Sequence, residues 1–326
     1  PLPQEKSKLL EMGTLVGHVA PGLAFVFMGL WHLFCHTKHY MQKPNSYRAG
    51  LWFPTSKMRY MEPLIIIFAS SASISMELFI GPRSHQPFDR DGTIPSNHLQ
   101  NFEHSSISLT FLTYGAFAIL FDKIKPIAYY EMTLLLGALA FGQQLFLFHL
   151  HSADHMGVEG QYHMILQAVI AVSLVTTLLG IPFPNSFIVS FVRSGSILFQ
   201  GFWFVVMGLM LWTPSLIPKG CFLNMEVGHK VVRCADESSL HRAKSLVNIQ
   251  FSWFLIFITL GIMLFYLAMD KFYGNRVQYT ALTKTGQLED EEEDDFPAME
   301  PTEKQSFGAA TTFVELGARG SSYMER

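Results

Sequence analysis

Several histidine and glutamate side chains that could do chemistry lie inside long apolar segments of the sequence or at their ends. A charge at the centre of a bilayer costs about 2.5 kcal/mol or more, so ionisable residues are rare in membrane spans. Neutral imidazole binds zinc, copper and iron, and a nearby carboxylate can bind the metal, orient an imidazole or act as a general base. The residues concerned are His18, Glu77, Glu103, His104, His149, His151, Glu159 and His163.

These residue types predict a site for a transition metal such as zinc, or for a haem. Zinc takes three or four such ligands at about 2.0–2.1 Å. The expected ligands are His18, His104, His149 and His163. The expected supporting residues are Glu77, Glu103, His151 and Glu159. A proton relay or a polar substrate pocket would use the same groups, and histidines that only contact headgroups, water or backbone are the remaining alternative.

The apolar segments that must position these residues are long enough to cross a membrane. The chain has 326 residues, of which 49% are hydrophobic and only 15% charged, whereas soluble domains carry about 25% charge. A span needs roughly 20 mainly apolar residues. Seven segments qualify: 13–35, 63–80, 99–121, 127–150, 162–181, 187–212 and 246–268. The sequence therefore predicts an all-α fold, a seven-transmembrane-helix bundle, with Arg193 interrupting the start of the sixth helix.

The order of the spans places the candidate residues at one depth. Odd-numbered spans begin, and even-numbered spans end, on the side of the N-terminus. His18 and His104 lie near the starts of spans one and three, and His149 and His163 lie on either side of the fourth connection. Residues two apart on a helix point in different directions, so we expect His149, rather than His151, to face His163. The candidate residues should form a layer in one leaflet.

Basic residues and cysteines predict the same orientation. Of the 23 Lys and Arg residues, 14 lie on the side of the first, third and fifth connections and the tail, if Arg193 at the start of the sixth span is counted with the fifth connection. This favours the cytosol for that side. Cys221 and Cys234 lie in the sixth connection, on the opposite side. A disulfide between them would need an oxidising compartment, and two free thiols are the alternative. We expect the N-terminus outside or lumenal, the C-terminus cytosolic, and the protein in the secretory pathway, endosomal or plasma membrane.

The sequence divides into three parts by composition. Residues 1–12 form an N-terminal segment, residues 13–270 the seven-helix domain, and residues 271–326 an acidic cytosolic tail. Seven consecutive acidic residues, Glu289–Asp295, predict disorder there. Tyr279 and Leu282 fit a tyrosine-based sorting signal that coat adaptors could read, although the same pattern also occurs in ordinary tail sequence.

Other polar residues in the apolar segments have simpler interpretations. His32, His36 and His39 share a helix face by their spacing and predict a cytosolic surface beside the membrane. Gln144 and Gln200 lie in the middle of spans, where amides commonly join helices by hydrogen bonds.

Four short motifs in the same seven-span frame resemble the transmembrane protein 45 family, as a plant-type member. They are Gly17–Gly22, Glu103–Ser105, Phe148–His151 followed by Glu159 and His163, and Leu198–Trp203. The resemblance covers roughly residues 12–270. It implies a multi-pass protein of the secretory pathway with a domain of unknown function, and no particular activity.

Three functions follow as expectations, and whether the protein is an enzyme stays open. The first is transport or membrane chemistry at the metal or haem site. The second is trafficking or scaffolding through the tail. The third is zinc-dependent lipid hydrolysis, because the chain also resembles, more weakly, the seven-span lipid hydrolases such as alkaline ceramidases. Expected partners are membrane lipids, a small-molecule or lipid ligand and coat adaptors, but not nucleic acid, since the net charge is −3.

Overall fold

The computed structural model describes residues 2–54, 58–80, 86–150, 157–226 and 229–274. The chain divides into two units, Pro1–Tyr279 and Thr280–Arg326, and the described residues all belong to the first. Among the residues singled out in the sequence, His151, Tyr279 and Leu282 lie outside the described residues.

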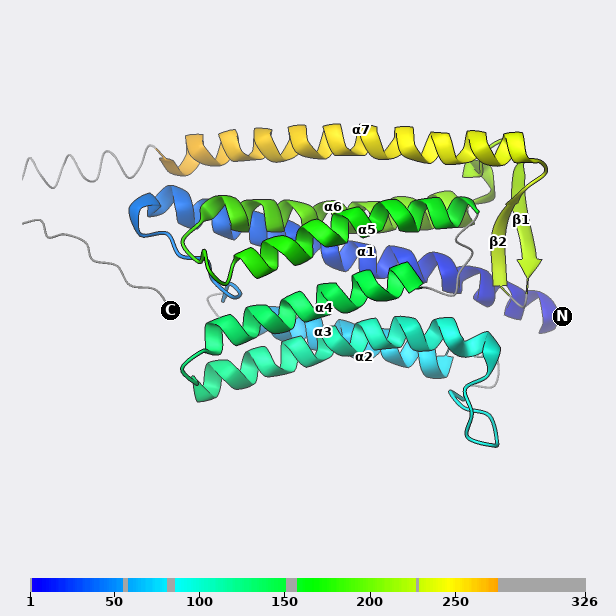
Figure 1. The fold of residues 1–326 in the computed structure, drawn as a ribbon, viewed down its shortest axis with the longest axis horizontal. Coiled ribbons are helices and arrows are strands. Elements are labelled where there is room, and N and C mark those ends of the chain that lie inside the picture. Colours follow the sequence, from blue (N-terminus) through cyan, green and yellow to red (C-terminus); the bar gives the residue numbers. More distant parts are fainter. Residues whose placement is uncertain (1, 55–57, 81–85, 151–156, 227–228, 275–326) are drawn as a thin grey trace, which may run out of the picture. The chain divides into compact units, whose positions relative to one another are not determined.

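Seven long helices form most of the described part of this unit (Figure 1). They are α1 (Leu2–Gln42), α2 (Met61–Ser75), α3 (Leu99–Ile124), α4 (Tyr129–Leu150), α5 (Val158–Leu179), α6 (Phe187–Trp212) and α7 (Glu237–Met269). Each is long and apolar enough to cross a membrane, α2 together with the turn Met76–Ile80 that continues it, which confirms the all-α, seven-helix prediction. Helix α6 has the expected bounds and continues through Arg193 without a break, whereas the other helices differ from the expected spans at one or both ends. The largest differences are in α1, which extends from Leu2 to Gln42, and in α7, which begins at Glu237.

The sixth connection contains a β-hairpin that was not predicted from the sequence. Strand β1 (Cys221–Glu226) pairs antiparallel with β2 (His229–Cys234). A disulfide joins Cys221, the first residue of β1, to Cys234, the last residue of β2. The Asp236 carboxylate then accepts a hydrogen bond from the Ser239 backbone N–H at 2.7 Å and caps α7. We call the end of the bundle that carries this hairpin the hairpin end, and the opposite end, where α1 finishes, the distal end (Figure 1).

Helices α1 and α6 make the closest pairing in the bundle, although they are far apart in the sequence. Glycine permits it: a Cβ atom on Gly29 would meet the Leu198 backbone, and one on Gly201 would meet the Val26 backbone nitrogen. Small residues at such interfaces let helix backbones approach closely in membranes. Most other neighbours follow the chain, with α2 against α3, α3 against α4, α4 against α5 and α5 against α6, and α7 lies mainly against α5.

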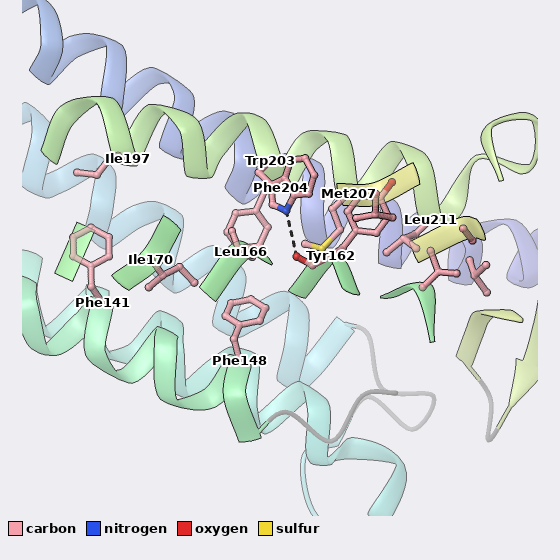
Figure 2. Close-up of a cluster of buried hydrophobic side chains, with 14 residues drawn as sticks. Phe141, Phe148, Tyr162, Leu166, Ile170, Ile197, Trp203, Phe204, Met207 and Leu211 are labelled. Atoms are coloured by element: carbon pink, nitrogen blue, oxygen red, sulfur yellow. Dashed lines mark hydrogen bonds between the residues drawn. The ribbon is translucent and has the colours of Figure 1, made fainter. Parts of the chain in front are cut away.

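The main buried cluster lies between α4, α5 and α6, with α7 packed at its edge (Figure 2). Trp203 is fully buried at its centre, and its indole Nε1–H donates to the Tyr162 backbone oxygen at 3.2 Å. Phe148 and Phe204 pack nearby with ring centroids 5.9 Å apart. This cluster fixes the helices that carry His149 and His163.

Candidate functional site

Two of the four expected ligands meet at the hairpin end. The imidazole rings of His18 on α1 and His163 on α5 have centroids 6.1 Å apart. The centroid of the His18 ring also lies 4.5 Å from that of the Trp212 ring, and the centroid of the His163 ring lies 5.3 Å from that of Phe148. The pair therefore sits in aromatic surroundings, and His163 is buried.

Glu77 and His104 form a second pair at this end. The His104 imidazole Nδ1 lies 3.2 Å from Glu77 Oε1, and the Asn101 side-chain amide donates to Glu77 Oε2 at 2.7 Å. Glu77 belongs to a wide π-type turn, Met76–Ile80, that continues α2; such turns are frequent at functional sites. Glu77 also lies within electrostatic range of His18, so the two pairs are neighbours.

The other expected site residues lie around these pairs. Glu103 and Glu159 are half-buried and within electrostatic range of His104. His149 is exposed, and its Nδ1 lies 3.2 Å from the Gln167 side-chain oxygen. Among the described residues, it is the neighbouring Phe148 that packs against the His163 ring. Among the described residues, no group of three or more His, Cys, Asp or Glu side chains is placed to hold a metal ion.

A third His–Glu pair lies at the distal end and was not predicted from the sequence. The His32 imidazole Nε2 on α1 lies 2.6 Å from Glu62 Oε1 at the start of α2. Glu62 is only 3% exposed, and its Oε2 accepts from the Phe53 backbone N–H at 3.3 Å. The only sequence signal for this pair was a glutamate directly before Pro63 at the edge of an apolar segment.

His36 lies one turn further along α1 and is completely buried. Its Nδ1 hydrogen-bonds the Tyr47 hydroxyl at 2.8 Å, and the Phe53 ring packs edge-on against it. The predicted membrane-surface face at His32 and His36 is therefore wrong. The connection after α1 folds back over these rings and removes them from water.

One face of α2 joins the two glutamates. Glu62, Ser70, Ser73 and Glu77 are 8, 3 and 4 residues apart, which places them on one side of a helix. The 15 residues from Glu62 to Glu77 span about 22 Å. The Ser73 hydroxyl lies 2.9 Å from the Ser108 hydroxyl on α3, one turn from His104. We call Glu62, Ser70, Ser73 and Glu77 together the α2 polar face.

Polar pairs also cross the centre of the bundle away from α2. The Gln200 amide donates to the Gln144 side-chain oxygen at 2.9 Å, and the Ser173 and Ser196 hydroxyls are 2.9 Å apart. The expectation that amides join helices at this depth agrees with the Gln144–Gln200 bond. These contacts link α4 to α6 and α5 to α6.

A family comparison covers the second half of the seven-helix unit. Residues 130–267, from near the start of α4 to near the end of α7, match the model described as a family of unknown function, DUF716. This is the family related to transmembrane protein 45, which the sequence motifs resemble. The matched range includes His149, His163 and Arg193, whereas both His–Glu pairs lie before it. The protein is therefore a multi-pass membrane protein whose residues 130–267 match the DUF716 family of unknown function.

Proposed function

We propose that the seven-helix unit transports protons across the membrane along the α2 polar face. The observation that carries this proposal is that α2 holds a carboxylate near each end, each hydrogen-bonded to an imidazole of a neighbouring helix: Glu62 to His32 and Glu77 to His104. Ionisable groups inside membrane spans commonly mark proton or ion pathways.

The chemistry of these groups suits proton transfer. Imidazole gains and loses a proton near neutral pH, and a bonded carboxylate can exchange that proton with it. Hydroxyls both donate and accept hydrogen bonds, so Ser73 and Ser108 could pass a proton between the pairs. The longest interval along α2, about 12 Å from Glu62 to Ser70, would have to be bridged by water and by the Tyr114 phenol, which lies within electrostatic range of Glu62.

Reconstitution tests this proposal directly. Full-length protein is placed in liposomes that contain a pH-sensitive dye, and a potassium diffusion potential drives proton entry. We expect proton uptake above that of protein-free liposomes, and we expect Glu62→Gln and Glu77→Gln to lower it to the protein-free rate. Each variant removes a titratable carboxyl but keeps the side-chain shape.

The matched control is Glu131→Gln, which removes a carboxylate from the exposed surface of the first turn of α4. It should leave the flux unchanged. Wild-type flux equal to that of empty liposomes, or flux that both α2 variants leave intact, contradicts the proposal.

A second candidate is metal or haem binding at the hairpin end, favoured by the proximity of His18 and His163. Elemental analysis and an absorption spectrum of the purified protein test it. Stoichiometric zinc, copper, iron or haem that is lost in His163→Ala supports it. Folded protein that holds none of these, and takes up none when they are offered, rules it out.

A further inference from the structure

The side chain of Arg193 is buried in the distal half of the bundle, about 9 Å along α6 from Phe187. It is only 6% exposed, and a guanidinium stays charged at any relevant pH. In the part of the chain that the structure describes, none of its N–H groups has a hydrogen-bond acceptor or a carboxylate partner at bonding distance. A buried charge without a partner is strongly unfavourable, so this side chain calls for an anion.

The two buried carboxylates of the distal end, Glu62 and Asp122, are committed to other partners. Glu62 bonds His32 and the Phe53 N–H. Asp122 accepts two hydrogen bonds from the Arg59 guanidinium, at 2.8 and 2.9 Å, and one from the Tyr60 hydroxyl at 2.8 Å. Neither carboxylate is hydrogen-bonded to Arg193.

A second unpartnered donor lies in the same region. His36 Nε2 is buried and has no hydrogen-bond partner among the described residues. With the Tyr47 hydroxyl donating to Nδ1, we assign the ring proton to Nε2, which makes it a donor. Arg193 lies within electrostatic range of His36 and of the Tyr47, Tyr114 and Tyr130 phenols. The region thus combines a cation, an imidazole donor and aromatic rings.

We propose that Arg193 and His36 bind the carboxylate of a small organic monoanion. The planar guanidinium fork matches a carboxylate in a two-point hydrogen bond, and one negative charge balances that of Arg193. A doubly charged phosphate would leave an unbalanced negative charge in the membrane interior. The phenol rings suit the carbon part of such an anion. Its movement together with a proton rests on the function proposed above, whereas binding itself does not.

Binding is measured on the purified full-length protein in detergent, at neutral pH and constant ionic strength. The probes are sodium benzoate and sodium acetate, compared with sodium phosphate and sodium chloride. We expect saturable binding of at least one carboxylate by titration calorimetry, with a Tm that rises with its concentration. Phosphate and chloride should do neither.

Substitutions at Arg193 locate the site. Arg193→Gln should raise the Kd of the carboxylate about tenfold or more, because a charge-assisted bond is lost. Arg193→Lys keeps the charge but loses the fork and should have an intermediate effect. The control is Arg242→Gln, since Arg242 is exposed near the start of α7, at the hairpin end; the Kd of this variant should equal that of the wild type.

Gly180→Ala tests whether the carboxylate binds at Arg193 if the Arg193 variants do not fold. A Cβ atom on Gly180 would lie 3.1 Å from Arg193 Nη1, so the added methyl must shift the guanidinium by a few tenths of an ångström without removing its charge. We expect weaker carboxylate binding in protein that still elutes as a single folded species. Wild-type protein that binds neither carboxylate saturably, or that binds phosphate instead, overturns the proposal, as does carboxylate binding that Gly180→Ala and every folded Arg193 variant leave unchanged.

The two proposals fail separately. Loss of proton flux in Glu62→Gln with carboxylate binding intact would support the proton pathway on its own. Carboxylate binding by wild-type protein that shows no proton flux would support the Arg193 site and reject the pathway.

Discussion

Removing the imidazole of His32 should destabilise the folded protein strongly. His32→Ala leaves the Glu62 carboxylate 3% exposed, with only the Phe53 N–H at 3.3 Å as a partner. Breaking a buried ion pair in this way costs about 3–5 kcal/mol. The lost hydrogen bond accounts for about 1.5–3 kcal/mol of that cost, and the unpaired buried charge accounts for the remainder, about 2 kcal/mol.

A double-mutant cycle separates the two contributions. In the Glu62→Gln background no buried negative charge remains, so His32→Ala should cost about 2 kcal/mol less than it does in the wild type. The free energy of unfolding is measured by titration with sodium dodecyl sulfate in mixed micelles, followed by circular dichroism and tryptophan fluorescence. The half-exposed hairpin pair Glu226–Arg233 serves as a control that should show much weaker coupling.

One result would refute this reasoning. If His32→Ala lowers the free energy of unfolding by the same amount in the wild type and in Glu62→Gln, the two side chains do not interact. The 2.6 Å contact between them would then contribute nothing measurable to stability, and it would no longer support an interaction of Glu62, at the distal end of the α2 polar face, with His32.

Three further predictions concern packing, the hairpin and pH. Gly29→Leu should prevent α1 from packing on α6 and cost at least about 1–3 kcal/mol, seen as a lower Tm, whereas Gly17→Leu should have little effect because its Cβ meets open space. Reduction of the Cys221–Cys234 disulfide should cost up to about 3 kcal/mol, and in denatured protein a maleimide should label one thiol before reduction and three after it. Burial raises the pKa of Tyr47 to about 12, above its ordinary value of about 10. Its stabilising contribution is therefore full below pH 10 and lost as the pH rises towards 12, so the Tm difference between wild type and Tyr47→Phe should shrink over that interval.

The spans were predictable because each depends only on local composition. A run of about 20 apolar residues must form a helix in lipid, where no water satisfies the backbone. The parity of the spans then placed His18, Glu77, His104 and His163 near one end of the bundle, and the structure has two pairs among these residues there. Arg193 was misjudged on the same grounds, because a single charge was read as a helix interruption.

Which side chains meet within that layer depended on helix rotation and packing. His149 and His163 are adjacent in the predicted topology, but Phe148 occupies the inward position and His149 turns towards Gln167. A shift of one residue rotates a side chain by about 100°, and nothing in the local sequence decides which of two neighbouring residues faces inward.

The sequence by itself determined the number of helices, their order and the end of the bundle at which each polar residue lies, since these follow from apolar length and chain direction. Only the tertiary structure decided that His32 and Glu62 form a buried pair and that Arg193 has no partner among the described residues. Those outcomes depend on contacts between α1, α2 and α6, and on the connection around Tyr47 and Phe53 folding back over the helix ends. Segments far apart in the chain create them, and no local pattern encodes such contacts.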